Sequence, residues 1–126
     1  MKLEPLVYVS NIDKSVLFYT KTLGFKLAEK YPNEDNPTFA AISIGKSRLE
    51  LVQSRKSNKA LTKKGLGGSG VQFYIQTNQV DKLWNQVNNK KIEIVSPIEN
   101  KDWGDREFSI KDPDGYLISF YTPTTE

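Results

Sequence analysis

Apolar and polar positions alternate near the start of the chain and then change to a helical period. Segment 5–10, PLVYVS, has apolar residues at every second position, which is typical of a strand with one buried face. Across 13–23 the apolar residues recur at helical spacing, at Val16, Leu17 and Leu23. Asn11 or Asp13 can cap the start of this helix, and Gly24 can end it. The pattern therefore predicts a strand followed by a helix.

The rest of the chain completes this plan and then repeats it. Three more strands are predicted in the first half, at 25–31, 38–44 and 48–53. A strand at 70–77 then leads to a helix at 79–89, whose apolar residues share one face. These residues are Val80, Leu83, Trp84 and Val87. Three strands follow, at 91–97, 106–112 and 116–122. Each half reads as strand, helix and three strands.

The two halves also resemble each other in sequence. The stretch VYVSNIDK is similar to FYIQTNQVDK, and SIGKSRLELV is similar to SIKDPDGYLISFY. An internal repeat of this length predicts two structural modules. The length of 126 residues suits one compact domain. We therefore expect a single domain over 1–126, with modules at 3–53 and 70–123 joined by a linker at 54–69.

Strand alternation assigns one face of each module to the core. The residues expected to face the helices are Val7, Val9, Leu49, Leu51, Val71, Phe73, Ile75, Ile118 and Phe120. The opposite face is mixed, with Tyr8, Arg48, Glu50, Gln72, Tyr74, Ser119 and Tyr121. Aromatic walls with a few convergent polar groups are typical of small-molecule pockets, so this face lines a cup if the sheets curl. Tyrosine also favours strands for its shape alone, which leaves the plainer interpretation open.

Composition removes several classes of chemistry. The chain has no histidine and no cysteine, which excludes Ser-His-Asp and Cys-His catalysis, disulfides, and metal sites that require imidazole or thiolate. Hydrophobic residues make up 37% and charged residues 26%, as in ordinary globular proteins. No apolar run approaches the length of a membrane span. We therefore expect a cytoplasmic protein without a membrane partner.

The net charge of +3 comes largely from a lysine-rich segment, Ser54 to Gly65. Nucleic-acid platforms usually interleave basic residues with stacking aromatics, and this segment has no aromatic residue. We interpret it as a solvated loop and expect no nucleic-acid partner. The positive net charge favours a neutral or anionic small molecule over a cation, although the charge at the site itself counts for more.

Two longer motifs resemble a known superfamily. The first is VSNIDKSVLFYTKTLGF, from Val9 to Phe25, and the second is WGDREFSIKDPDGYLISFY, from Trp103 to Tyr121. Both are similar to motifs of the vicinal oxygen chelate superfamily, which groups glyoxalase I, bleomycin resistance proteins and extradiol dioxygenases. The resemblance covers nearly the whole chain. It implies an α+β fold of two tandem βαβββ modules that form a cupped mixed β-sheet with helices on the outer face, commonly as a homodimer.

The resemblance also places the metal-binding positions of the superfamily's enzymes on this chain, at Glu4, Glu50, Gly70 and Ser119. Gly70 offers no side chain, and Ser119 offers a hydroxyl where a glutamate is usual. Catalytic metals need about three protein ligands and an open position for substrate. Two carboxylates and a hydroxyl would hold Mg²⁺ weakly at best, because Mg²⁺ keeps most of its waters. We therefore expect no bound metal and no other cofactor.

Three functional hypotheses follow. The leading one, implied by the resemblance, is a metal-free binding protein of the bleomycin-resistance type, which sequesters or senses an aromatic or amphipathic ligand, as in antibiotic resistance. Trp103 and the tyrosines would stack on the ligand, Arg48 and Arg106 would engage its anionic or carbonyl groups, and Glu4 and Glu50 its cationic groups. The alternative is a lyase, isomerase or dioxygenase-like enzyme with Glu50 as general base, with or without a weakly held metal. The third is an interaction protein whose cup is vestigial.

Several of these residues also have purely structural interpretations. Arg106 could pair with an acidic neighbour at Asp102, Asp105 or Glu107, and Trp103 could be a dimer contact. The run DPDG predicts a tight turn, in which Asp112 caps and Gly115 tolerates a positive φ.

Overall fold

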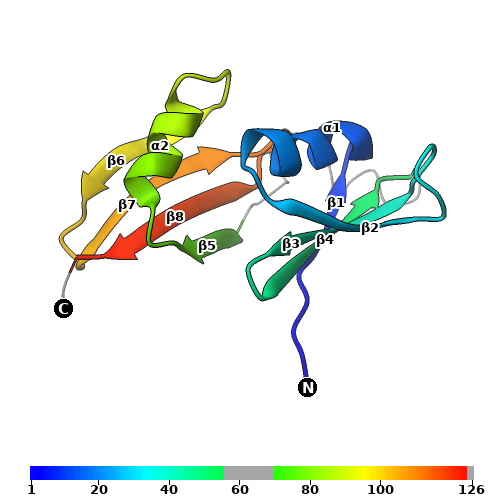
Figure 1. The fold of residues 1–126 in the computed structure, drawn as a ribbon, viewed down its shortest axis with the longest axis horizontal. Coiled ribbons are helices and arrows are strands. Elements are labelled where there is room, and N and C mark those ends of the chain that lie inside the picture. The colour runs from blue at the N-terminus through cyan, green and yellow to red at the C-terminus, as the bar shows by residue number, and fades with distance from the viewer. Residues whose placement is uncertain (56–69, 125–126) are drawn as a thin grey trace. The chain divides into compact units, whose positions relative to one another are not determined.

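The computed structural model describes residues 1–55 and 70–124. The chain divides into two compact units, residues 1–67 and 68–126. Each unit is a four-stranded mixed sheet with helical structure on one face, which makes the fold α+β (Figure 1). The predicted linker and most of the lysine-rich segment lie outside the described residues, so the module boundaries stay predictions.

The first unit follows the predicted order of elements. Its elements are β1 (Leu6–Val9), α1 (Ile12–Leu17), the π-helical turn η1 (Phe18–Thr22), β2 (Lys26–Tyr31), β3 (Phe39–Ile44) and β4 (Ser47–Gln53). The strands lie in the order β1-β4-β3-β2, with β1 parallel to β4 and the other pairs antiparallel. Helix α1 contacts β3 and β4 and is capped by Asn11, whose side chain accepts a hydrogen bond from the Lys14 backbone N–H.

The second unit repeats this topology. Its elements are β5 (Gln72–Gln76), α2 (Val80–Asn88), β6 (Ile94–Asn100), β7 (Asp105–Lys111) and β8 (Leu117–Pro123). The strands lie in the order β5-β8-β7-β6, and β5 is parallel to β8. Helix α2 packs across β6, β7 and β8 (Figure 1). The two units therefore share one plan, as the internal repeat predicts.

The buried apolar residues alternate along β1, β4 and β8. In the first unit Val9 and Leu51 are fully buried against the helical side, and in the second Phe108 and Phe120 are. Trp84 of α2 packs on Phe108, with ring centroids 5.2 Å apart. The predicted core faces of β1, β4 and β8 are therefore confirmed.

Three local predictions are wrong. Leu17 is exposed and Tyr19 is buried instead. The buried face continues through Ile12, Val16, Tyr19 and Leu23 at helical spacing, and Leu17 lies on the other side of the helix. The helix then widens into η1, where the Leu23 backbone N–H donates to the carbonyl of Phe18, five residues back. Val71 is exposed and precedes β5. The strand predicted at 91–97 is shifted toward the C-terminus and runs from Ile94 to Asn100.

The DPDG turn is built as predicted. The Asp112 carboxylate accepts hydrogen bonds from the backbone N–H groups of Asp114 and Tyr116, each at 2.9 Å. Gly115 has a φ of 90°, a conformation that favours glycine. The turn therefore joins β7 to β8 in register, with Lys111 opposite Leu117. Within the described part of the chain, neither helix has the length and apolar character needed to cross a membrane.

Candidate functional site

The face of the second sheet that points away from α2 carries a group of polar and aromatic side chains. The β7–β8 register places Glu107 opposite Tyr121 and Ser109 opposite Ser119, while the parallel β5–β8 register places Tyr74 beside Ser119. Because alternate residues of a strand point to one face, these side chains lie together. We call them, with Asp105 and Trp103, the second-sheet face.

Tyr74 is the centre of this face. Its hydroxyl oxygen lies 2.6 Å from Asp105 Oδ2 and 2.6 Å from Glu107 Oε1. Desolvation of the hydroxyl raises the pKa of Tyr74, and the hydrogen bonds to Asp105 and Glu107 raise it further. Its ring stacks on that of Tyr121, with centroids 4.2 Å apart and planes 14° apart. The phenol has one proton, so it donates to one carboxylate at a time.

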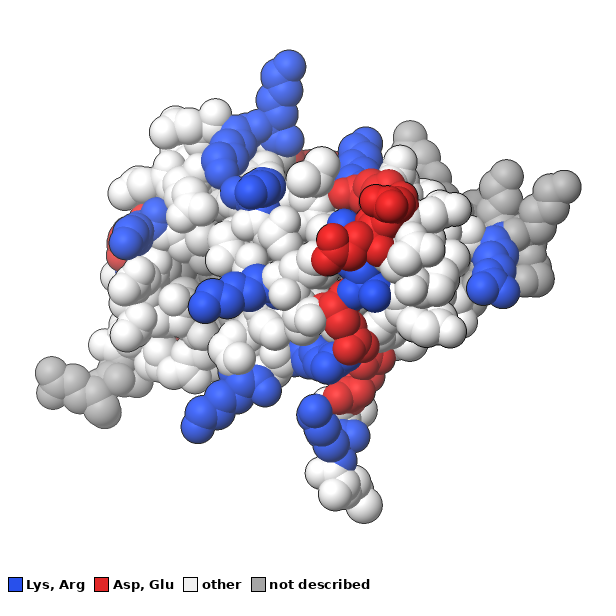
Figure 2. Space-filling model, turned by 45° about the vertical axis from the view of Figure 1, so that its right-hand side comes forward, with Lys and Arg blue, Asp and Glu red and all other residues white. Residues whose placement is uncertain are grey.

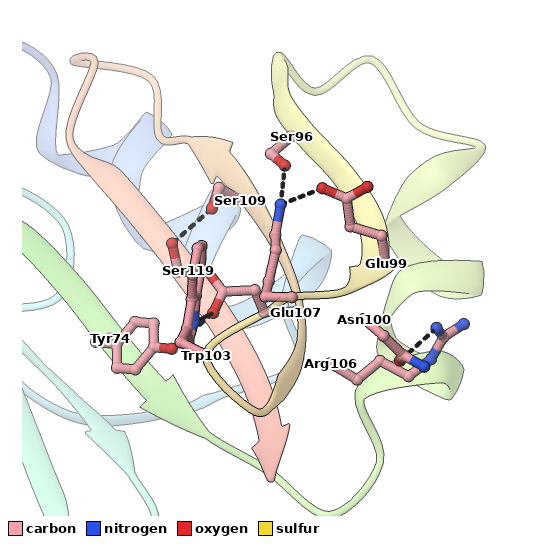
Figure 3. A network of polar contacts seen from close by, with 10 residues as sticks. Tyr74, Ser96, Glu99, Asn100, Trp103, Arg106, Glu107, Ser109 and Ser119 are labelled. Atoms are coloured by element: carbon pink, nitrogen blue, oxygen red, sulfur yellow. Dashed lines mark hydrogen bonds and ion pairs between the residues drawn. The ribbon is translucent and has the colours of Figure 1, made fainter. Parts of the chain in front are cut away.

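Trp103 is exposed but held in place. Its side chain lies in the turn between β6 and β7 and is 62% exposed, yet its Nε1–H donates to Glu107 Oε1 over 3.1 Å (Figure 3). The ammonium of Lys101 lies 5.8 Å from the centre of the indole ring, within the range of a cation–π contact. Lys101 itself donates to Ser96 Oγ over 3.0 Å and pairs with Glu99. The indole is thus a large exposed surface with a fixed polar edge.

Ser119 is placed differently from the prediction of a ligand-facing hydroxyl. It is 0% exposed, and its Oγ lies 2.6 Å from Ser109 Oγ and accepts a hydrogen bond from Gln72 Nε2. These contacts occupy the hydroxyl, so in this structure it supports the sheet face from within. Gln72, also predicted to contact ligand, is exposed and bonds to Ser119.

Arg106 is directed away from the second-sheet face. Its guanidinium binds both carboxylate oxygens of Asp81 on α2, at 2.9–3.1 Å, and donates to Asn100 Oδ1 over 3.0 Å. Figure 3 shows Arg106 and Asn100 apart from Trp103, Glu107 and Tyr74. The hydrogen bonds from Arg106 lower the pKa of Asp81. Its partner is therefore acidic but lies on the helix, whereas the sequence suggested Asp102, Asp105 or Glu107.

The first unit has its own line of charges on the sheet face opposite α1. Arg48 pairs with Glu29 at 2.7 Å and lies 3.6 Å from Glu50, and Lys2 pairs with Glu4 at 2.9 Å. Desolvation, followed by the hydrogen bond to Glu4, raises the pKa of Glu50, while the hydrogen bond from Lys2 lowers the pKa of Glu4. On the face shown in Figure 2, acidic side chains gather in one strip that basic side chains border and interrupt.

Tyr8 shares that face, since Val7 and Val9 on either side of it are buried. Strand β1 runs beside β4 with Leu6 opposite Glu50 and Tyr8 opposite Val52. The structure therefore brings together Tyr8, Arg48 and Glu50 on one sheet, and Tyr74, Trp103 and Tyr121 on the other.

Among the described residues, two of the four positions that the resemblance assigned to a metal supply no free ligand. No group of three or more acidic side chains there is arranged to hold an ion. Glu4 and Glu50 lie in the first unit, whereas Gly70, with a φ of 74°, and the buried Ser119 lie in the second. The hydroxyl of Ser119 is already bonded, and a glycine supplies no ligand. The donor set of these residues does not fit a catalytic metal of the superfamily.

Sequence reasoning missed three members of the second-sheet face, Asp105, Glu107 and Ser109. They are alternate residues of β7, and Glu107 and Ser109 are buried although they point away from α2. The signal was present in the run DREFSIK, where they alternate with Arg106, Phe108 and Ile110. Applying strand alternation to this segment places them beside Ser119 and Tyr121.

Comparison with known proteins identifies the family. Residues 3–120 match the model of the Glyoxalase/Bleomycin resistance protein/Dioxygenase superfamily. The chain belongs to this superfamily, as its two motifs and its paired four-stranded sheets indicated.

Relatives and solved structures agree over nearly the full length. A bleomycin resistance protein of Geobacillus stearothermophilus is 28% identical over 130 residues, covering 93% of this chain and 92% of its own. A structure of unknown function from Agrobacterium tumefaciens has a TM-score of 0.79 and 24% identity, covering 97% of this chain and 94% of its own. An antibiotic binding protein of Streptomyces sp. CB03234 has a TM-score of 0.70 and 22% identity, covering 95% and 93%. These two structures establish the fold.

Proposed function

We propose that this protein binds a flat aromatic small molecule on the second-sheet face and does so without a metal. The observation that carries this proposal is Trp103, which exposes 62% of its surface while a hydrogen bond to Glu107 holds its edge. An exposed large aromatic residue with a fixed orientation is a ready stacking platform. The stacked pair of Tyr74 and Tyr121 supplies a second aromatic surface on the same face.

The names of two similar proteins support the binding of an antibiotic-like compound. One is a bleomycin resistance protein and another is an antibiotic binding protein. We infer that this chain sequesters or senses a compound of that general kind. A homodimer, a cytoplasmic location and the absence of a nucleic-acid partner stay predictions from the sequence.

The charges near the site change the expected ligand. The net charge of the chain favoured a neutral or anionic compound, but Arg48 and Arg106 each have an acidic partner within their own unit. On the second-sheet face the carboxylates of Asp105 and Glu107 converge on one hydroxyl. Local charge outweighs net charge at short range, because nearby charges interact most strongly. We therefore expect neutral or cationic aromatic compounds to bind better than anionic ones.

A second candidate function rests on Glu50. Its raised pKa brings this carboxyl group closer to the working range of a general base. This hypothesis predicts turnover of a 2-oxoaldehyde–thiol adduct that Glu50→Gln abolishes. A screen of the purified protein with and without Mn²⁺, Ni²⁺ or Fe²⁺ tests it, and absence of turnover in every condition rejects it.

The binding proposal is tested by fluorescence titration with two probes, bleomycin and the neutral flat dye lumichrome. In a Trp84→Phe background Trp103 is the single tryptophan. We expect saturable quenching that does not change with EDTA, and a loss of affinity in Trp103→Ala of about 1–3 kcal/mol, the usual range for stacking on an aromatic side chain. Because Trp103→Ala removes the reporter, its affinity is measured by calorimetry.

The matched control is Tyr31→Ala, which removes an aromatic side chain of similar exposure, 66%, from the first unit. This variant should bind both probes as the unmodified protein does. Equal affinities of Trp103→Ala and the unmodified protein for both probes would exclude Trp103 as the platform and refute the proposed site.

A further inference from the structure

One oxygen atom connects the two aromatic surfaces of the second-sheet face. Glu107 Oε1 accepts a hydrogen bond from Trp103 Nε1 over 3.1 Å and another from the Tyr74 hydroxyl over 2.6 Å. Trp103 belongs to the β6–β7 turn, and Tyr74 belongs to β5 at the other edge of the sheet. Figure 3 shows the Glu107 carboxylate beside the indole of Trp103, with Tyr74 close by. The indole and the phenol are therefore held by the same acceptor.

Glu107 is well suited to hold other side chains because it is itself held. It lies in the middle of β7, paired with Tyr121 of β8, and is 5% exposed. A buried side chain on a central strand has few alternative rotamers. Trp103, by contrast, is in a turn closed by the hydrogen bond from the Gly104 N–H to the Lys101 carbonyl, and little of its ring is covered. Without the bond to Glu107, its ring would keep much of its rotational freedom.

We infer that Glu107 is a positioning residue, whose Oε1 fixes the indole of Trp103 relative to Tyr74 so that a flat ligand meets two aromatic surfaces already set in place. The inference rests on the proposed function, since it assigns Glu107 a role at that same site. Binding then avoids the cost of ordering the indole. Immobilising a side chain with several rotamers costs binding affinity, on the order of three- to tenfold when converted to a dissociation constant.

To position the indole, residue 107 needs a hydrogen-bond acceptor and not a negative charge. This requirement distinguishes the positioning role from a purely electrostatic effect of Glu107 on the ligand. Glutamine keeps an Oε1 acceptor at the same position without the charge, whereas methionine keeps the length of the side chain and has only a weak sulfur acceptor. Asp105→Asn removes one negative charge from the same cluster without touching the indole, because Asp105 bonds to Tyr74 and not to Trp103. Together, the three variants distinguish the effect of the hydrogen-bond acceptor at residue 107 from the effects of negative charge and of side-chain packing.

The test measures Trp103 in the Trp84→Phe background by steady-state anisotropy, together with lumichrome affinity by calorimetry. Glu107→Met is expected to lower the anisotropy and weaken lumichrome binding by about three- to tenfold, the cost of ordering one side chain. Glu107→Gln should retain both values within twofold, and Asp105→Asn should retain the anisotropy of Trp103. Thermal melts by circular dichroism confirm that each variant is folded. If Glu107→Met does not fold, Glu107→Leu replaces it.

The outcomes separate the inference from the proposed function. Unchanged anisotropy and affinity in Glu107→Met, with weakened binding in Trp103→Ala, overturn the positioning role and leave the site intact. Equal losses in Glu107→Gln and Glu107→Met also overturn it, because the acceptor would then not matter. A third outcome is that Glu107→Met lowers the anisotropy while both Glu107→Met and Trp103→Ala bind lumichrome as the unmodified protein does. This outcome overturns the proposed function together with the inferred role of Glu107 in binding.

Discussion

Two fully buried serines should respond in opposite ways to the same substitution. Ser15 of α1 and Ser119 of β8 are both 0% exposed. Ser15 Oγ has no hydrogen-bond partner among the described residues, whereas the hydroxyl of Ser119 contacts Ser109 and Gln72. We therefore predict that Ser15→Ala stabilises the protein and that Ser119→Ala destabilises it.

The magnitude for Ser15→Ala follows from three contributions. Burial of an unsatisfied hydroxyl costs about 1–3 kcal/mol, which the substitution recovers. Alanine adds up to about 0.7 kcal/mol of helix propensity. The lost packing of one oxygen atom offsets part of this gain, at most about the value of a buried methylene, ~0.8 kcal/mol. The net expectation is an increase of about 1–2 kcal/mol in the free energy of unfolding.

Ser119→Ala removes a partner instead of an unsatisfied group. The amide of Gln72 can turn to water because that residue is exposed, but the hydroxyl of Ser109 remains buried. One buried hydroxyl left without its partner gives an expected loss of about 1–2 kcal/mol. The two variants therefore differ by about 2–4 kcal/mol for the same change of atoms.

Urea denaturation and thermal melts followed by far-ultraviolet circular dichroism measure both variants, because this signal reports on both units. Tryptophan emission alone would follow only the second unit, since Trp84 and Trp103 both lie there. Each kcal/mol corresponds to a shift in Tm of about 3–5 °C for a chain of this length. A Ser15→Ala variant less stable than the unmodified protein, or shifts of the same sign in both variants, would refute the reasoning.

Two further predictions concern carboxylates in structural positions. Because the pKa of Glu50 is raised by desolvation and by Glu4, its stabilising contribution is complete below the ordinary value of 4.5 and is lost as the pH rises through its folded pKa. Urea denaturation at several pH values measures this. Between pH 4.5 and neutrality, the free energy of unfolding should fall less in Glu50→Gln than in the unmodified protein or in the control variant Glu29→Gln. Equal dependence of the free energy of unfolding on pH in all three proteins would contradict this. Asp112→Ala should cost about 2–4 kcal/mol in urea denaturation, because the carboxylate accepts two backbone hydrogen bonds, while Asp112→Asn, which keeps an acceptor, should cost less. Equal costs for the two substitutions would show that the turn does not depend on the acceptor.

At the first helix, local sequence rules and tertiary packing decide different features. The sequence offers Asn11 or Asp13 as the cap, and the structure uses Asn11. It correctly places Gly24, with a φ of 81°, after the end of the helix. It places Leu17 in the core wrongly, because the buried face follows Ile12, Val16 and Tyr19, and Leu17 lies on the other side of the helix. Local rules describe how a helix begins and ends, whereas packing against β3 and β4 decides which of its residues are buried.

The sequence by itself determined the repeated order of elements, the alternating core of β4 and β8, the DPDG turn and the absence of histidine and cysteine chemistry. These features depend on near neighbours in the chain, through the periods of helices and strands and the backbone preferences of Pro and Gly.

Only the tertiary structure decided which polar side chains meet. Arg106 pairs with Asp81, 25 residues away on α2, and Glu107 joins Trp103 to Tyr74, 33 residues away on β5. Such contacts depend on strand register and on where a helix crosses the sheet, and neither is encoded in residue spacing. The same register carries Ser119 into the interior, where its hydroxyl is bonded to Gln72 and Ser109, and leaves the exposed aromatic surface of this sheet to Trp103.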